Sequence, residues 1–279
     1  MAVFSRLATT VLNRAIRAVN RAIGAPRAVI TAAVIGVVAV ATAAALLLAQ
    51  GGRPAGAGAV GAPRRPPRTR VVSQAPAMAG TTVLATVLES APGYARPGGR
   101  VAGTVPASWY GRPSVLPVIG TWPGWVRVRL AQRPNGSTAW LPTADVTLAS
   151  TPYRIVINLA TTHLALYDNG RLVFSAPAGV GTTDDPTPTG EYFVAFDEPP
   201  PQPGVGYGPF VLVTSAHSLA ISDWEGSGDA VIGIHGPLGM DAEIGTTGAR
   251  ISHGCVRLHG QALDRLAGVP PGTPIDVIG

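Results

Sequence analysis

The residues best suited to chemistry surround the only cysteine of the chain, in the segment Ile251-Ser252-His253-Gly254-Cys255-Val256-Arg257-Leu258. A glycine directly before the thiol lets the backbone turn tightly, because glycine carries no side chain. Amide N–H groups that point the same way at such a turn stabilise a thiolate and bind the oxyanion of a carbonyl under attack. The segment therefore predicts a nucleophilic thiol beside an oxyanion site.

Two histidines could remove the thiol proton: His253 in the same segment, and His235 upstream in Ile234-His235-Gly236. Distance along the chain does not choose between them, because a base needs only to lie within hydrogen-bond reach after folding. On an extended segment, the His253 ring would run alongside the thiol, whereas a side chain from another element can approach it head-on. This geometry favours His235 and leaves His253 open.

The pattern formed by His235, residues 236–251 and then Ser252-His253-Gly254-Cys255 resembles the signature of the L,D-transpeptidase family, with its YkuD-like catalytic domain. The resemblance implies a mainly β protein with an L,D-transpeptidase-type β-sandwich catalytic domain. It implies that Cys255 attacks a peptidoglycan stem peptide after its diaminopimelate residue and releases D-alanine. The acyl group then passes to an amine of a neighbouring stem, which forms a cross-link in cell-wall biogenesis and needs no cofactor.

The resemblance also implies the roles of the groups that assist the thiol. Cys255 is the nucleophile and His235 the general base and acid, with the Gly236 carbonyl orienting the imidazole. The amides of Gly254 and Cys255 are the expected oxyanion donors. An isolated thiol is mostly protonated at neutral pH, since its pKa is about 8.5, so a nearby base is needed for a fast reaction.

Four further residues are expected to line the substrate pocket: Ser252, His253, Arg257 and Tyr207. Arg257 stands where the family pattern often has asparagine. Tyr207 lies in the proline-rich loop of residues 198–208, which is too long for a hairpin and is expected to form a lid. The segment Pro186-Thr187-Pro188-Thr189-Gly190 resembles a Thr-Pro-x-Gly element common in the family, so the resemblance spans residues 151–279.

Three other functions were weighed against cross-linking. A zinc hydrolase would use His235, His253 and Cys255, but the usual paired ligand spacings are absent and we expect no metal. An L,D-carboxypeptidase would share the acyl-enzyme and pass it to water. A non-enzymatic wall-binding protein would carry the thiol incidentally. The family resemblance favours the L,D-transpeptidase and implies carbapenem-type β-lactams as inhibitors that acylate Cys255.

Composition and charge argue against other classes of protein. A hydrophobic content of 46% excludes a disordered chain. All 21 basic residues are arginine, and the net charge is +6. Ten of them lie outside the expected folded region, which leaves no basic patch interleaved with aromatics and no nucleic-acid partner. These ten are Arg6, Arg14, Arg17, Arg21, Arg27, Arg53, Arg64, Arg65, Arg68 and Arg70.

The N-terminal part of the sequence is typical of a membrane anchor. Residues 1–27 form a basic segment expected in the cytoplasm, and residues 28–49 are apolar and uncharged. At ~1.5 Å per residue, this run as a helix crosses a bilayer core of about 30 Å. More arginines precede the run than follow it closely, which favours a cytoplasmic N-terminus. We therefore expect a single-pass protein of the cell membrane, with a Pro/Gly/Arg-rich linker at residues 50–80 and the catalytic domain outside.

Two β-rich domains are expected after the linker. Residues 81–150 contain short strands, and Gly124-Trp125-Val126-Arg127-Val128 resembles bacterial SH3-like domains, which predicts a small barrel. Its tryptophans could line a ligand groove or pack in the core. Residues 151–279 form the expected catalytic domain, with a hairpin turn at Asp168-Asn169-Gly170 and one helix at residues 261–267. We expect a monomer.

Overall fold

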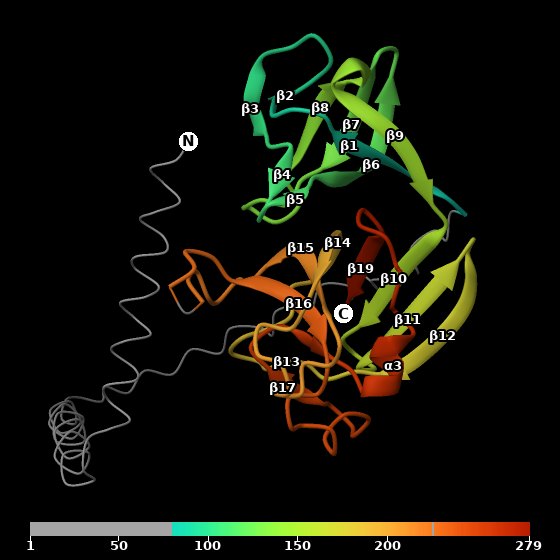
Figure 1. Cartoon of the computed structure of the whole chain (residues 1–279), viewed down its shortest axis with the longest axis vertical. Helices are drawn as coiled ribbons and strands as arrows, with labels where there is room; N and C mark the ends of the chain where they lie inside the picture. Colours follow the sequence, from blue (N-terminus) through green and yellow to red (C-terminus); the bar gives the residue numbers. More distant parts are fainter. Residues whose placement is uncertain (1–79, 225) are drawn as a thin grey trace, which may run out of the picture. The chain divides into compact units, whose positions relative to one another are not determined.

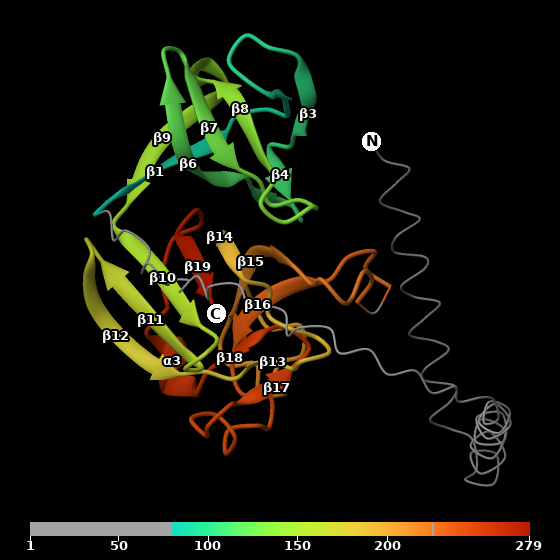
Figure 2. The same ribbon diagram turned by 180° about the vertical axis from the view of Figure 1, so that it is seen from behind.

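The computed structural model describes residues 80–224 and 226–279, and these residues form a mainly β structure (Figures 1 and 2). The expected cytoplasmic segment and membrane anchor lie outside the described residues, as does the linker up to residue 79. Within the described part of the chain, no helix is both long and apolar enough to cross a membrane. Both β-rich regions belong to one compact unit, Val71–Gly279.

The first region is a seven-stranded sheet with the strand order β3-β2-β8-β7-β6-β1-β9. Apolar and polar residues alternate along its strands, as expected when one face is buried. In β7, Val126 and Val128 are buried, while Arg127 between them is exposed. The likeness to SH3-like domains stays a prediction. The strands are β1 (Thr82–Val87), β2 (Ala91–Tyr94), β3 (Val101–Val105), β6 (Val115–Trp122), β7 (Trp125–Arg129), β8 (Thr138–Pro142) and β9 (Val146–Thr151), with a small ribbon of β4 (Ser108–Trp109) and β5 (Arg112–Pro113) and a 3-10 turn η1 (Thr143–Asp145).

The tryptophans of this first region do not share one environment. Trp125 packs edge-on against Tyr94, with ring centroids 5.1 Å apart. Trp122, beside the β6–β7 turn, is 62% exposed. Packing against another aromatic ring therefore accounts for the half-buried Trp125 but not for the exposed Trp122.

The second region is an eight-stranded sheet with the order β12-β11-β10-β19-β14-β15-β16-β18. The first half of β14 pairs with β19 and its second half with β15, so β14 links two halves of the sheet. Side chains from both halves meet in one hydrophobic core. The strands are β10 (Tyr153–Asn158), β11 (His163–Asp168), β12 (Arg171–Pro177), β14 (Gly190–Glu198), β15 (Val211–His217), β16 (Val231–His235), β18 (Val256–Arg257) and β19 (Pro274–Ile278), with a parallel pair of β13 (Val180–Gly181) and β17 (Arg250–Ser252).

Two local expectations can be compared with this region. The hairpin turn between β11 and β12 is confirmed: Asn169 and Gly170 both have positive φ, 49° and 76°, as a tight two-residue turn requires. The helix is shorter than expected, because α3 covers only Gly260–Asp264. From Arg265 onward the amides bond to the carbonyl three residues back, which tightens the chain into turns until Gly268.

Strand β15 is buried on both faces, and so is the middle of β14, residues 192–196. Every residue of β15 is buried. One face belongs to the core of the second region, and the other joins a second core that includes Val128 and Leu141 of the first region together with Phe193 and Val213. The two regions therefore share hydrophobic packing along these strands.

Candidate active site

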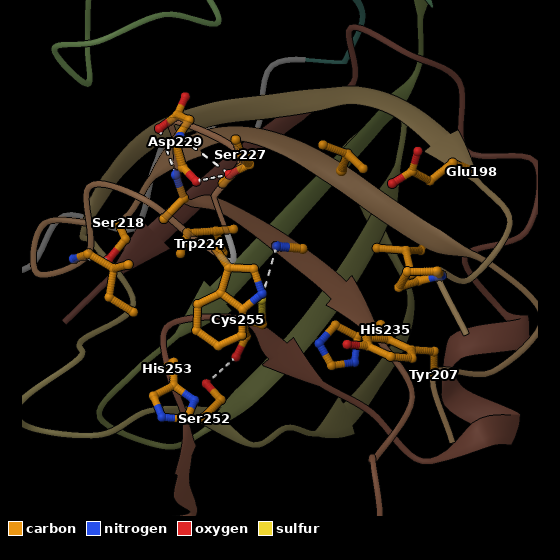
Figure 3. A pocket seen from close by; sticks show the side chains of 18 of the residues that line it. Glu198, Tyr207, Ser218, Trp224, Ser227, Asp229, His235, Ser252, His253 and Cys255 are labelled. Atoms are coloured by element: carbon orange, nitrogen blue, oxygen red, sulfur yellow. Dashed lines mark hydrogen bonds between the residues drawn. The ribbon is translucent and has the colours of Figure 1, made fainter. Parts of the chain in front are cut away.

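Strand pairing brings the thiol and the imidazole together. Strands β16 and β18 run parallel, with His235 opposite Arg257 and Ile234 opposite Val256. The Gly233 N–H donates to the Cys255 Sγ at 3.4 Å. Since alternate residues of a strand share a face, Gly233 and His235 lie on the same side of β16, and the thiol lies above the glycine. Figure 3 shows Cys255 and His235 in the same pocket.

The absence of a side chain at Gly233 keeps the space between these two groups open. A Cβ there would lie 3.7 Å from the His235 Cδ2 and 3.1 Å from the Val211 Cγ1. The second of these distances is tighter than ordinary van der Waals contact. A glycine at this place thus lets the sulfur approach the strand beside the imidazole.

His235 is held as a neutral base. Its side chain is buried, and its Nδ1 lies 2.8 Å from the Gly236 carbonyl oxygen. A carbonyl only accepts, so Nδ1 carries the proton and Nε2 is left as the acceptor. Burial lowers the pKa of His235 to about 4; the Gly236 bond opposes this shift and the charge of Arg257 adds to it. The imidazole is therefore neutral, and able to take a proton, throughout the neutral range.

Cys255 rests as a thiol. Burial raises the pKa of Cys255 above its ordinary value, against the opposing effects of the Gly233 N–H and the charge of Arg257. At neutral pH the sulfur consequently keeps its proton until a base removes it. The protonated thiol and the neutral His235 imidazole are therefore a matched donor and acceptor for this proton.

A buried hydroxyl on each side holds the turn that carries the thiol. The Ser252 Oγ accepts from the Gly254 N–H at 3.1 Å and donates to the Cys255 carbonyl at 2.6 Å. The Thr187 Oγ1 donates to the Gly254 carbonyl at 2.7 Å and accepts from the Gly181 N–H at 2.9 Å. Gly254 has a φ of 119°, which favours glycine, and a Cβ there would lie 2.7 Å from Ile232.

The two expected oxyanion donors differ in this structure. The Gly254 N–H is already bonded to Ser252, whereas the Cys255 N–H donates to no atom of the described residues. The Cys255 amide is thus available to a carbonyl oxygen without any rearrangement, and the Gly254 amide would first have to leave its serine.

The thiol opens into a cavity of about 540 Å³. It is lined by all the residues expected there: Ser252, His253, Cys255, Arg257, His235 and Tyr207. Tyr207 packs on the imidazole, with ring centroids 5.0 Å apart, and its carbonyl accepts from the Gly236 N–H. The proline-rich loop therefore does reach the site through Glu198, Pro201 and Tyr207.

Arg257 is a cation at the edge of this cavity with donors to spare. Among the described residues, its side chain donates one hydrogen bond, from NH1 to the Pro237 carbonyl at 3.5 Å, and its buried Nε has no partner. A guanidinium with unused donors suits a carboxylate. The arginine can therefore receive a negatively charged part of a substrate beside the thiol.

His253 is turned to other partners. Its Nε2 lies 3.9 Å from the Asp185 Oδ2, its ring lies tilted with its centroid 5.5 Å from that of Trp224, and the side chain is exposed. The site therefore places His235, rather than His253, in position to serve the thiol. Elsewhere, His217 is buried and His163 is exposed, and neither lines the cavity.

Four residues that build the site were not predicted from the sequence: Gly233, Thr187, Trp224 and Asp229. Thr187 lies in the Thr-Pro-x-Gly element, which resembles the family pattern but does not indicate what the threonine hydroxyl binds. Trp224 and Asp229 line the cavity from a loop between β15 and β16 that has no motif. Among the described residues, no group of three or more His, Cys, Asp or Glu side chains is arranged to hold a metal ion.

Residues 152–277 match the YkuD family, described as the L,D-transpeptidase catalytic domain. The match covers just under half of the chain. The YkuD protein of Bacillus licheniformis is 34% identical over 127 residues, which cover 45% of this chain and 66% of the relative. The chain thus spans just under two thirds of that relative's length.

Solved L,D-transpeptidases also resemble the chain. The enzyme from Mycobacterium smegmatis aligns over 56% of this chain and 91% of its own, with 18% identity and a TM-score of 0.34. A mutant of the Enterococcus faecium enzyme aligns over 61% of this chain and 72% of its own, with 20% identity and a TM-score of 0.36.

Proposed function

We propose that this protein is a peptidoglycan L,D-transpeptidase in which Cys255 is the acyl nucleophile and His235 its general base and acid. One observation carries the proposal: the β16–β18 pairing puts a protonated thiol, held by the Gly233 N–H at 3.4 Å, beside a neutral imidazole in an open cavity. The assignment of residues 152–277 to the L,D-transpeptidase catalytic domains supports the reaction class.

The first half-reaction forms a thioester. The His235 Nε2 takes the thiol proton while the Cys255 Sγ attacks the carbonyl carbon of diaminopimelate, in the amide bond that joins this residue to D-alanine. The Cys255 N–H holds the oxyanion of the tetrahedral intermediate. As the C–N bond breaks, His235 returns the proton to the leaving nitrogen, and D-alanine departs.

The second half-reaction transfers the acyl group. An amine of a neighbouring stem attacks the thioester carbon, and His235 removes a proton from the amine nitrogen. The C–S bond breaks, the new amide bond forms, and the proton returns to the Cys255 sulfur. If water replaces the amine, the same acyl-enzyme gives the L,D-carboxypeptidase reaction.

The remaining pocket residues bind the donor in this proposal. Arg257 receives a carboxylate of the stem peptide with its unpaired donors, and Tyr207 packs on the imidazole and narrows the cavity beside it. Ser252 fixes the turn that aims the thiol, while His253 and its partner Trp224 shape the cavity wall.

The test is intact-mass spectrometry of the wild-type protein and Cys255→Ala after incubation with a tetrapeptide stem. We expect D-alanine release or a covalent adduct in the wild type alone, and an added amine acceptor then separates transfer from hydrolysis. Peptidoglycan binding without either event, in the wild type as in Cys255→Ala, would point instead to a non-enzymatic wall-binding protein.

A carbapenem provides a second probe of the same thiol. Its strained amide carbonyl is open to the attack proposed for Cys255, so we expect a mass increase equal to the drug in the wild type and none in Cys255→Ala. An unmodified wild-type mass after prolonged incubation would count against the proposed nucleophile.

We also propose that the protein is a monomer anchored in the cell membrane, with its N-terminus in the cytoplasm and its catalytic region facing the wall. The arginine bias around residues 28–49 supports this orientation. Protease added to intact spheroplasts should digest the catalytic region and spare an N-terminal tag; the reverse result would overturn the orientation.

A further inference from the structure

One wall of the cavity is built from a loop that the sequence does not mark. We call residues 218–224 and 226–230, between β15 and β16, the pocket loop. Its lining residues include Ser218, Ile221, Trp224 and Asp229. Figure 3 shows the labelled loop residues on one side of Cys255, and His235 with Tyr207 on the other. A donor peptide that reaches the thiol must therefore pass this wall.

The pocket loop has few hydrogen bonds of its own. At its base, the Ser218 N–H donates to the Ala230 carbonyl at 2.8 Å. At the tip, the Trp224 N–H donates to the Asp229 carbonyl at 2.9 Å, and the Gly228 N–H donates to the Asp223 Oδ1 at 2.8 Å. Apolar packing of the loop is thin, because Leu219 is 69% and Trp224 45% exposed. A loop with few buried contacts opens easily unless another element restrains it.

That restraint comes from the first β-rich region, from the β7–β8 connection. The guanidinium of Arg133 makes three hydrogen bonds to the pocket loop: Nε to the Asp229 Oδ1 at 3.0 Å, NH1 to the Ser218 carbonyl at 2.9 Å, and NH2 to the Ile221 carbonyl at 3.1 Å. One side chain thus ties the two ends of the loop together.

Asn135 adds a second tie at the last residue of β15. Its Nδ2 donates to the His217 carbonyl at 2.8 Å, and its Oδ1 accepts from the His217 N–H at 2.9 Å. The amide therefore pairs with the backbone as a neighbouring strand would.

Asp229 completes the connection from the side of the loop. Its Oδ2 lies 2.8 Å from the Nδ1 of the buried His217, while its Oδ1 accepts from Arg133. Burial alone would raise the pKa of Asp229, but its hydrogen bonds with His217, Ala230 and Arg133 together lower it. The carboxylate is therefore charged where it meets the arginine.

The first region also supplies a residue to the wall itself. Tyr110, between β4 and β5, lines the cavity. Its ring lies 6.4 Å from Phe196 of β14, and it is 56% exposed. An exposed aromatic ring with a hydroxyl at the cavity wall suits contact with a peptide.

We propose that the first β-rich region completes the donor-binding site: Arg133 and Asn135 are positioning residues that hold the pocket loop, and Tyr110 is a specificity-determining contact for the donor peptide. The claim about Tyr110 and the donor rests on the proposed acyl transfer. The claim about the loop rests only on the contacts of Arg133 and Asn135.

Hydrogen exchange of the full chain tests the loop without any substrate. In Arg133→Gln, the amides of residues 218–230 should exchange about tenfold faster than in the wild type. The matched control is Arg129→Gln, because Arg129 also joins the two regions, through Glu191 at 2.7 Å, but among the described residues it makes no hydrogen bond or ion pair to the pocket loop. If the loop amides exchange at the wild-type rate in Arg133→Gln, the positioning role of Arg133 is overturned. An equal increase in both variants would overturn it too.

Kinetics of D-alanine release from a tetrapeptide stem tests the binding role. Arg133→Gln and Tyr110→Ala should each raise KM about tenfold, while iodoacetamide alkylates Cys255 at the wild-type rate and Arg129→Gln keeps the wild-type KM. Asn135→Ala is the second variant if Arg133→Gln does not fold. An unchanged KM in folded variants overturns the proposal. If the wild type releases no D-alanine, the proposed function fails. Hydrogen exchange then still tests whether Arg133 positions the pocket loop.

Discussion

At the scale of single residues, the site depends on two ionisable groups that burial pushes in opposite directions. Burial keeps the Cys255 sulfur protonated and keeps the His235 imidazole neutral. Both shifts have the same cause, because a buried site disfavours charge on either group. The resting site is thus an uncharged pair, and proton transfer between the two is left to the reaction itself.

The lowered pKa of His235 predicts a pH-dependent stability. An unfolded imidazole has a pKa near 6.5 and the folded one about 4, so the unfolded chain binds more protons between these values. The contribution of His235 is complete above pH 6.5 and is lost as the pH falls toward 4. It amounts to roughly 3 kcal/mol.

Urea unfolding at pH 7 and pH 4 checks this prediction. The wild type should lose roughly 3 kcal/mol more free energy of unfolding over this range than His235→Gln does, because glutamine does not titrate. Equal losses in the two proteins would show that the imidazole is not buried as a neutral group.

Thr187 should prove as important to the turn as its two hydrogen bonds suggest. Thr187→Val keeps the shape but leaves the Gly254 carbonyl and the Gly181 N–H without this partner, at a cost of about 1–3 kcal/mol in stability. We expect D-alanine release to fall about tenfold or more, since the turn carries the thiol. Thr187→Ser retains the hydroxyl and should stay near the wild type in both measurements; similar losses in both variants would argue for a packing role.

At the scale of elements, the site is a contact between the end of β16 and the loop that follows β14. The Tyr207 carbonyl accepts from the Gly236 N–H at 2.7 Å, and the Gly206 carbonyl accepts from the Leu238 N–H at 3.1 Å. Gly236 also supplies the carbonyl that orients His235. The position of this loop and the tautomer of the base are therefore linked through one glycine.

Gly236→Ala is the substitution that breaks this link. A Cβ at Gly236 would lie 2.5 Å from the Gly206 carbonyl oxygen, so the loop must move away. We expect D-alanine release to fall at least tenfold while the circular dichroism spectrum keeps its β signature.

Gly260→Ala is the control for this substitution, because a Cβ at Gly260 meets nothing within 4 Å and its backbone is not strained. It should retain wild-type activity. Wild-type activity in Gly236→Ala as well would show that the loop and the base are independent.

At the scale of the whole described molecule, the two β-rich regions share a hydrophobic core. Val128 and Leu141 of the first region and Phe193 and Val213 of the second belong to the same cluster of buried side chains. Arg133 and Arg129 add polar contacts across the same pair of regions. We therefore expect the two regions to unfold together rather than one after the other.

A mutation in either region should then destabilise both. Val128→Ala removes buried methyl groups from the first region, and its effect should appear as a single transition at lower urea concentration, by about 1–3 kcal/mol. Tryptophan fluorescence follows mainly the first region, which holds four of the five tryptophans, and loss of carbapenem acylation follows the second. Two separate midpoints would contradict the shared core.

The sequence by itself pointed to the candidate nucleophile and to much of the local structure. The spacing of His235 and the Ser-His-Gly-Cys segment pointed to the nucleophile and favoured one base, and residues 152–277 do match the L,D-transpeptidase catalytic domains. Alternation gave the strands such as β7, and Asn169-Gly170 gave a hairpin turn, because these features depend on neighbouring residues alone. A candidate reactive thiol can also be recognised from neighbouring residues, because the glycine turn that it needs lies in its own segment.

Only the tertiary structure decided which distant groups serve that thiol. Gly233 and Thr187 act on Cys255 through strand pairing and hydrogen bonds between segments far apart in the chain. Arg133 reaches Asp229 across 96 positions, and no local pattern records such a contact. The protonation states of His235 and Cys255 were likewise set by burial. Burial and long-range hydrogen bonds exist only once the sheets have packed. The sequence could therefore suggest candidate reacting residues but not the residues that form the cavity wall around them.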